Sequence, residues 1–154
     1  MPSDLWSFTL DFYARANVEQ ACLDLQGHGA NVCLLLFGIW LDKRGVSYEA
    51  PRLQSITGLS TSWDETVVRP LRQLRTQWRT AASTDATLSD LRDEVKKLEL
   101  KAEQELLRRL EHLAEGWPTQ RVQNEHRWLS ALAGEAGGLS RDALTALRAT
   151  ADPT

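Results

Sequence analysis

The sequence is poor in cysteine, glycine and proline, and each shortage excludes a class of protein. Two cysteines, Cys22 and Cys33, are too few for the disulfide framework of a small secreted domain. Both lie among apolar neighbours, so we expect buried, reduced thiols in a cytoplasmic protein. Nine glycines and five prolines in 154 residues are too few for a collagen-like or broadly disordered chain. The composition therefore indicates an ordinary folded domain that is long enough to bury a core.

Long apolar runs and strong net charge are also missing. The stretch without a polar side chain at 32–41 has ten residues, whereas a membrane-spanning helix needs about 20. Residues 1–30 carry four acids and one arginine, which is the reverse of the positive start of a secretory signal. The formal net charge of −3 gives no whole-molecule attraction to nucleic acid or anionic lipid. We therefore expect a cytoplasmic protein with no membrane contact, and we do not expect nucleic acid as its main partner.

The spaced motifs that mark common catalytic and metal sites are absent from the sequence. His28, His112 and His126 form no HExxH or Glu-x-x-His pattern, and the two cysteines stand eleven residues apart without a second pair. The stretch "GHGANV" lacks the spacing of the phosphate-binding glycine motifs, and no GxSxG marks a nucleophile. The sequence thus predicts no metal ligand, cofactor or catalytic residue and favours a non-enzymatic role.

The most informative stretch that is present is "GANVCLLLFGIWLDKRG". Its three consecutive leucines favour a helix over a buried strand, because a buried strand prefers β-branched residues. Asn31 is a suitable N-cap, and Gly45 is a suitable residue to end the helix. A helix that is apolar on all sides must be enclosed by other elements. A helix over about 31–44 is therefore predicted at the centre of the core.

The middle of the chain predicts a long charged helical hairpin over about 62–115. Ser62 and Glu65 resemble a capping box, and the apolar positions that follow recur every three or four residues. Pro70 lies inside this pattern and is expected to kink the helix. The second helix ends before Gly116 and combines a narrow apolar stripe with dense mixed charge, so it is expected to lie on the surface or to project from the body.

Together these patterns predict an all-α fold of six to eight helices, since no segment shows the period-2 alternation of a strand. Residues 1–133 are expected to form one domain, with a core unit at 1–60, the hairpin, and a packing helix at 118–133. The glycine-rich stretch "GEAGG" is interpreted as a hinge, which a short helix and a frayed tail follow within 134–154.

The N-terminal pattern "LWSFTLDFYARANVEQACLDLQGHGANVCLLLFGIWLDKRG" resembles an uncharacterised family of small proteobacterial proteins that is classed as a domain of unknown function. The region shared by that family covers roughly the first two-thirds of such a chain, and the C-terminus varies. The resemblance implies a bacterial cytoplasmic protein with an N-terminal helical unit. It implies no activity and no catalytic residues.

The most distinctive charged feature is a row of arginines in the first helix of the hairpin: Arg69, Arg72, Arg75 and Arg79. They span roughly 120° of a helix, and no acid lies between the first and the last. One interpretation is that they pair with acids of the neighbouring long helix, of which the candidates are Glu99, Glu103 and Glu105. The other is a docking face for an acidic protein or for the phosphates of nucleic acid.

These observations favour a non-catalytic adaptor or regulatory protein that binds an acidic partner through the arginine face, or associates with itself through the long charged helix. A first alternative is a protein or enzyme that binds a lipidic or prenyl-type ligand in a pocket beside the central helix. The residues expected to line that pocket are Tyr13, His28, Phe37 and Trp40. A second alternative is nucleic-acid binding through the same arginines.

Overall fold

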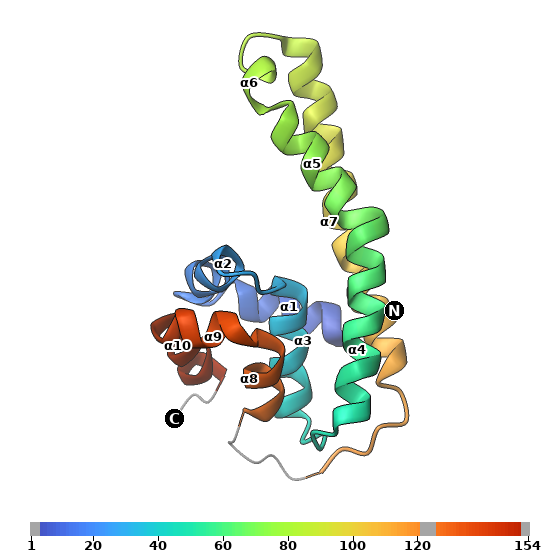
Figure 1. The fold of residues 1–154 in the computed structure, drawn as a ribbon, viewed down its shortest axis with the longest axis vertical. Helices are drawn as coiled ribbons and strands as arrows, with labels where there is room; N and C mark the ends of the chain where they lie inside the picture. Colours follow the sequence, from blue (N-terminus) through green and yellow to red (C-terminus); the bar gives the residue numbers. More distant parts are fainter. Residues whose placement is uncertain (1–3, 121–125, 152–154) are drawn as a thin grey trace.

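The computed structural model describes residues 4–120 and 126–151, and most of these residues fold into helices (Figure 1). Many of the connections are short turns, but an extended segment follows α7, and its Thr119 forms an isolated β-bridge with Val46. The elements are α1 (Asp4–Tyr13), α2 (Val18–Gly27), α3 (Val32–Lys43), α4 (Ala50–Trp63), the π-helical segment η1 (Asp64–Val68), α5 (Arg69–Gln77), α6 (Arg79–Ala82), α7 (Ala86–Leu113), α8 (Arg127–Ala133), α9 (Glu135–Leu139) and α10 (Arg141–Ala151). The predicted all-α class is confirmed.

Helix α3 is the predicted central helix. The Asn31 Oδ1 accepts a hydrogen bond from the N–H of Leu34 at 3.3 Å, which caps the first turn. Gly45 ends the segment with φ of +69°, in the left-handed region that glycine adopts without strain. All residues from 35 to 41 are buried. The prediction of an enclosed apolar helix is confirmed for this stretch.

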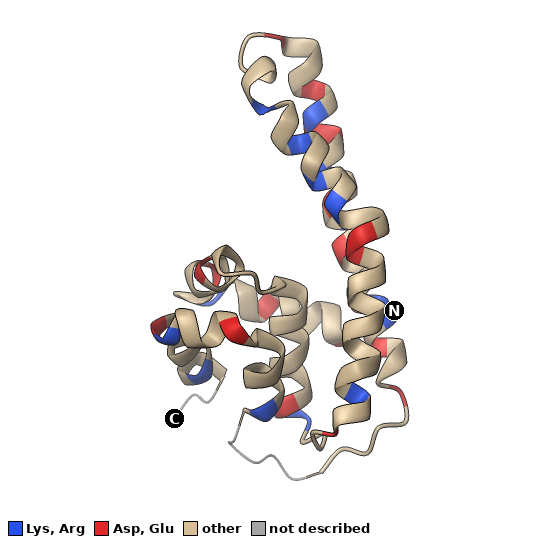
Figure 2. Ribbon diagram, in the orientation of Figure 1, with Lys and Arg blue, Asp and Glu red and all other residues tan. Residues whose placement is uncertain are grey.

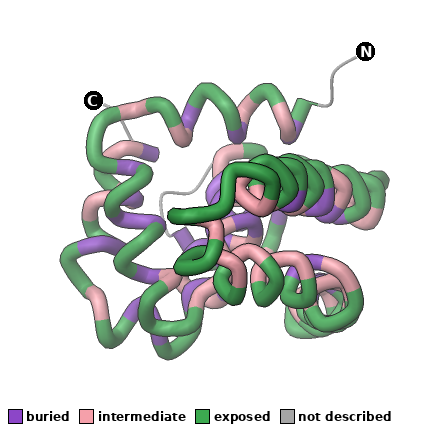
Figure 3. The backbone as a smooth tube through the Cα atoms, turned by 90° about the horizontal axis from the view of Figure 1, so that it is seen from above, coloured by how far each residue is buried: buried purple, intermediate pink, exposed green. Residues whose placement is uncertain are grey.

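Two apolar clusters share α3 as their common wall. Leu35 and Ile39 belong to a cluster built mainly with α2, α10 and part of α8. Phe37 and Leu41 belong to a second cluster, built with α1, α4, α7 and part of α8. Viewed from above, the buried stretches of these helices turn inward and the exposed stretches form the outer edge (Figure 3). The body is thus a set of helices around α3, as an all-round apolar helix requires.

Helix α8 approaches α3 closely because position 38 is glycine. A Cβ at Gly38 would lie 3.0 Å from Cδ1 of Leu132 and 3.2 Å from the backbone nitrogen of Leu129. The carboxylate of Asp42, near the end of α3, accepts hydrogen bonds from the N–H groups of Trp128 and Leu129, both at 3.0 Å. A side chain of one helix therefore caps the start of the other.

A long helical hairpin forms an arm that leaves the body (Figure 1), and its outgoing path begins earlier than the predicted start near residue 62. Helices α4, η1 and α5 form its outgoing path from Ala50 to Gln77, and α7 returns beside them. The capping-box interpretation of Ser62 is wrong, because Ser62 lies inside α4, which begins at Ala50 with Pro51 in its first turn. Charged residues of both signs follow one another along the arm (Figure 2).

Most of the glycine-rich stretch predicted to be a hinge is helical. Gly134, with φ of +56°, separates α8 from α9, and the residues after it form α9, in which Ala136 and Gly137 are buried. That Gly134 acts as a hinge stays a prediction. A Cβ at Gly137 would lie 3.1 Å from Cδ2 of Leu144, so the absence of a side chain lets α9 pack tightly on α10. With α9 formed, and with the arm path divided at Trp78, the described residues contain more helices than the six to eight predicted.

The C-terminal helix α10 is part of the body. Leu147 is fully buried in the cluster around α2, and the carbonyl of Ala151 accepts a hydrogen bond from Nζ of Lys43 at 2.8 Å. Within the predicted packing helix at 118–133, α8 begins at Arg127. The part of that prediction at 121–125, and the predicted frayed tail at 152–154, lie outside the described residues.

Two further expectations concern the state of the cysteines and the possibility of a membrane-spanning helix. Cys22 and Cys33 are free thiols and are buried, as predicted. In the described ranges 4–120 and 126–151, no helix combines the length and the apolar character that crossing a membrane requires.

Candidate functional site

A cleft of about 670 Å³ opens where the arm leaves the body. Helices α1 and α2, the first turns of α3, and the elements η1, α5 and α7 all contribute to its walls. Val32, Cys33 and Leu36 of the central helix are among the lining residues. The central helix is therefore enclosed along most of its length but borders a cleft at its beginning.

Leucines dominate the apolar lining, and some of them are exposed. Leu10 of α1, Leu23 of α2 and Leu100 of α7 have exposed fractions of 55%, 44% and 55%. Behind them, Leu106 and Leu107 of α7 are buried. Large apolar side chains that converge on a concave surface while remaining exposed to water are typical of a binding site.

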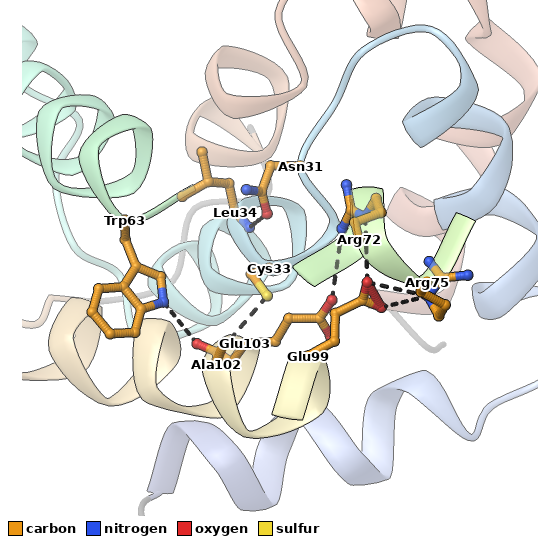
Figure 4. Close-up of polar contacts among 9 residues, drawn as sticks. All are labelled: Asn31, Cys33, Leu34, Trp63, Arg72, Arg75, Glu99, Ala102 and Glu103. Atoms are coloured by element: carbon orange, nitrogen blue, oxygen red, sulfur yellow. Dashed lines mark hydrogen bonds and ion pairs between the residues drawn. The ribbon is translucent and has the colours of Figure 1, made fainter. Parts of the chain in front are cut away.

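Arg72 supplies the main positive charge at the cleft wall. Its guanidinium lies 3.9 Å from Glu99 and 3.7 Å from Glu103, both on α7 (Figure 4). Charge-assisted hydrogen bonds are usually about 2.7–2.9 Å long. The donors of Arg72 are therefore not saturated by its two acidic neighbours. Arg75, in contrast, makes close contacts with Glu99, at 3.0 and 3.2 Å.

Glu103 is a carboxyl group of the cleft whose pKa is shifted by its surroundings. Burial raises the pKa of its carboxyl above the usual value, the nearby Glu99 carboxylate raises it further, and Arg72 and Arg75 act in the opposite direction. Burial likewise raises the pKa of the Tyr13 hydroxyl. The cleft thus contains a carboxyl group that takes up a proton more readily than an exposed glutamate does.

The π-helical segment η1 shapes the arm side of the cleft. Pro70 has no N–H to donate to the carbonyl four residues earlier, which weakens the α-helical pattern at this point. The N–H of Arg69 instead donates to the carbonyl of Asp64, five residues earlier. The side chains of these two residues form an ion pair at 2.9 Å, and both line the cleft. The irregularity predicted at Pro70 is therefore this π-helical turn, and such turns occur frequently at functional sites.

The body side of the cleft holds a buried hydroxyl group without a partner. Thr9 is 7% exposed and lines the cleft, and its Oγ1 has no hydrogen-bond partner among the described residues. The neighbouring Cys33 has its Sγ 4.0 Å from the carbonyl oxygen of Glu103. Burial raises the pKa of the Cys33 thiol strongly, so this group stays protonated at neutral pH and is a weak hydrogen-bond donor.

The four predicted arginines do not form one open face. Arg69 pairs with Asp64, and Arg72 and Arg75 turn toward the acids of α7. This is the internal pairing that one interpretation of the sequence predicted, with Glu99 and Glu103 as the acids; Glu105 instead pairs with Arg108 and Arg109. Arg79 lies in α6, beyond the break at Trp78, and makes no ion pair within the described residues. That these arginines bind a partner stays a prediction.

The four residues expected to line a ligand pocket do not come together. Tyr13 lines the cleft. His28 lies across the turn between α2 and α3, in a second and more open pocket of about 510 Å³. Phe37 is fully buried and stacks on Trp40, with ring centroids 5.9 Å apart. Trp40 is fixed from the other side by a hydrogen bond from its Nε1 to Asp4, at 3.1 Å. The expectation that Phe37 and Trp40 face a pocket with the others is therefore corrected: they are core residues.

Sequence reasoning missed Thr9 and the exposed leucines of the cleft, and it identified Glu103 only as a possible partner of the arginines. Leu10, Leu23 and Leu100 fall outside the main apolar stripes of their helices. Leucines in such positions indicate an apolar surface outside the core, so the sequence did contain a signal for this part of the cleft. Thr9 had no usable signal, because a threonine inside a helix is unremarkable until its neighbours are known. In the described parts of the chain, no group of three or more histidine, cysteine or acidic side chains is placed to hold a metal ion.

Residues 4–110 of the chain match the model of a protein family that is described as "Protein of unknown function (DUF2390)". The chain belongs to the DUF2390 family. The matched region runs from α1 into α7 and includes every residue that lines the cleft. Helices α8, α9 and α10 lie outside it. Neither a search of curated proteins nor a search of solved structures found a match to the chain.

Proposed function

We propose that this protein binds a small amphipathic carboxylate in the cleft between the arm and the body. The observation that carries the proposal is the meeting of exposed leucines with an incompletely paired Arg72 in one concave site. The volume of about 670 Å³ lies within the range of small-molecule sites. The protein would then act as a carrier, sensor or enzyme for that ligand class.

The apolar half of the ligand would cover Leu10, Leu23 and Leu100. These side chains come from three different helices and face the same hollow, so one flexible chain is able to contact all of them. Removing each square ångström of apolar surface from water contributes about 25 cal/mol. This contribution favours an aliphatic tail over a compact polar ligand.

The charged half of the ligand would bind beside α5. Arg69 and Arg72 are three residues apart and therefore lie on one side of that helix, and both line the cleft. The first turn of α3, which also lines the cleft, adds the partial positive charge of a helix N-terminus. A planar carboxylate matches the fork of donors that an arginine offers.

The acids of the cleft would respond to such a ligand. Asp64 is already neutralised by Arg69, whereas Glu103 is paired only at long distance. Because its pKa is raised, Glu103 would take up a proton when an anion approaches Arg72. Binding of the carboxylate is therefore expected to be accompanied by proton uptake, and to weaken as the pH rises through the raised pKa of Glu103.

Titration with a fluorescent long-chain fatty acid, and with the fatty alcohol of the same length in competition, tests this function. The acid should bind at least about tenfold more tightly than the alcohol, because one charge-assisted contact contributes about 1.4 kcal/mol or more. Arg72→Gln should abolish this preference. Arg79→Gln is the matched control, since Arg79 lies outside the cleft, and it should leave both affinities unchanged.

A second pair of variants tests the apolar wall. Leu100→Asp places a charge in the cleft and should weaken the acid and the alcohol alike. Leu139→Asp changes a leucine that is also exposed but lies on α9, away from the cleft, and should have no effect. Equal binding by both variants, or failure of the wild type to bind either probe, would overturn the proposal.

A second candidate function is protein interaction in an adaptor or regulatory role. It is favoured by the shape of the molecule, because the arm projects well beyond the body (Figure 1). The arginine face is less suited to this role than its sequence suggests, since Arg72 and Arg75 are engaged with α7. The same pairing argues against a free basic row for nucleic acid.

A further inference from the structure

The arm exposes a strip of leucines that the cleft does not use. Leu74 of α5 and Leu91 and Leu98 of α7 have exposed fractions of 38%, 52% and 49%. None of the three lines the cleft. The arm therefore carries an apolar surface of its own.

The strip lies on the side of the arm opposite to the ion pairs. At roughly 100° per residue, Leu91 and Leu98 lie about 50° to one side of the buried Val95, whereas Glu99 and Glu103 lie about 60° to the other. On α5, Leu74 lies on one side of the seam between the two helices and Arg72 on the other. The offset of Leu74 has the same direction as that of the two leucines of α7, and the offset of Arg72 has the same direction as that of the two glutamates. Since the two helices run antiparallel, equal offsets lie on the same side of the hairpin. One side is thus closed by Arg–Glu pairs and the other is open and apolar.

A row of charges flanks this strip on α7, and its order is informative. Asp90, Glu94, Lys97 and Lys101 are all exposed and lie within roughly 60° of one another around the helix. The two acids come first and the two bases follow. Glu94 and Lys97 pair within the helix at 3.1 Å, but both side chains are mostly exposed, so this pair contributes little and leaves both groups available.

We infer that the strip is covered by the arm of a second copy of this chain, with the two arms antiparallel. A two-fold axis near residues 94 and 95 would place Leu91 of each copy against Leu98 of the other. The same axis would place the acidic half of each row against the basic half of the other, whereas a parallel arrangement would oppose like charges. The row is therefore complementary to itself only in the antiparallel arrangement.

The shape of the molecule is compatible with this arrangement. The body lies at the base of the arm and leaves its outer part clear on both sides (Figure 1). Antiparallel arms would place the two bodies at opposite ends of the assembly. The four arm helices would then form a bundle in which each neighbour runs antiparallel, and the exposed leucines would become its core.

Sedimentation equilibrium over a wide concentration range tests the inference. The wild type should form dimers reversibly, and Leu91→Glu/Leu98→Glu should raise the dissociation constant of the dimer by about tenfold or more. Leu139→Glu is the matched control, because Leu139 is exposed on α9, and it should dimerise like the wild type. Far-UV circular dichroism establishes that each variant is folded. A wild type that stays monomeric at every concentration overturns the inference.

Charge exchange tests the antiparallel order directly. Lys97→Glu/Lys101→Glu makes the row wholly negative and Asp90→Lys/Glu94→Lys makes it wholly positive, so each variant alone should be monomeric. An equimolar mixture should restore a dimer that contains one copy of each. Two variants that dimerise alone, or a mixture that stays monomeric, would contradict the proposed arrangement. The cleft lies on the other side of the arm, so fatty-acid binding should be unchanged in both variants, and the two proposals fail independently.

Discussion

The guanidinium of Arg72 lies 3.7 Å from a carboxylate oxygen of Glu103, across the seam between α5 and α7 and at the wall of the cleft. The two residues come from helices that face each other at the base of the arm (Figure 4). A contact at this point belongs both to the packing of the arm and to the lining of the candidate site. Any ligand that changes the charge of Glu103 would also change the interaction between the two arm helices.

Glu103→Gln should stabilise the protein at neutral pH. The pKa of Glu103 is raised in the native state, so the native protein binds this proton more tightly than the unfolded chain does. The resulting stabilisation is complete below the unfolded value near 4.5 and is lost as the pH rises through the native value. At pH 7 the charged form is a cost that glutamine avoids, and we expect Tm to rise by about 1–3 °C.

The pH dependence of that effect provides its control. Well below pH 4.5 the wild-type carboxyl is protonated in both states, and the difference in Tm between Glu103→Gln and the wild type should vanish. Calorimetry from about pH 3 to 8 measures both curves. A variant that is less stable than the wild type at pH 7 would show that the long contact with Arg72 outweighs the burial of the charge.

Gly38→Ala should destabilise the body. The added Cβ would lie 3.0 Å from Cδ1 of Leu132 and 3.2 Å from the carbonyl carbon of Trp128, so α3 and α8 would have to move apart. We expect a loss of about 1–3 kcal/mol in the free energy of unfolding, measured by denaturant titration. Gly58→Ala is the control: it lies in α4 with open space around it, and it should gain about 0.5–1 kcal/mol. Equal effects of the two substitutions would refute the close contact.

Asp42→Ala should weaken the attachment of α8. Its carboxylate oxygens accept the N–H groups of Trp128 and Leu129, and without them these donors would lose their cap. A loss of about 1–2 kcal/mol is expected. Hydrogen exchange at residues 128 and 129 should accelerate more than exchange in α3. Asp11→Ala removes an exposed carboxylate whose partner among the described residues is Arg15, and it should change stability by less than about 0.5 kcal/mol.

Local capping patterns predicted some helix ends and failed at others. Asn31 caps α3 as predicted. Here the cap agrees with the tertiary structure, because the apolar run that follows is buried as a helix. The Ser62–Glu65 pattern looks equally good in the sequence, yet α4 runs through it. A cap contributes only about 1 kcal/mol, whereas the burial of Ile56 and Val68 on either side favours one continuous path into η1. Tertiary packing decides such cases.

The segment "GEAGG" shows the same principle. Glycines weaken a helix by about 1 kcal/mol each, so the sequence favours a hinge. In the fold, the missing side chain of Gly137 is what permits close contact with Leu144, and packing recovers the lost propensity. The arginine row is a third example: the spacing showed that the side chains share a face, but whether acids of α7 meet that face depended on the register of the hairpin.

The apolar run at 32–41 by itself determined that this protein is built around one buried helix, because no other environment in water suits ten consecutive apolar side chains. The mixed charges of the following segments likewise determined that a long hairpin lies at the surface. Only the tertiary structure decided that the first turn of the buried helix borders a cleft, and that Thr9, Arg72 and Glu103 meet there. These residues lie far apart in the chain, and their proximity depends on how the arm leaves the body, which no local pattern encodes.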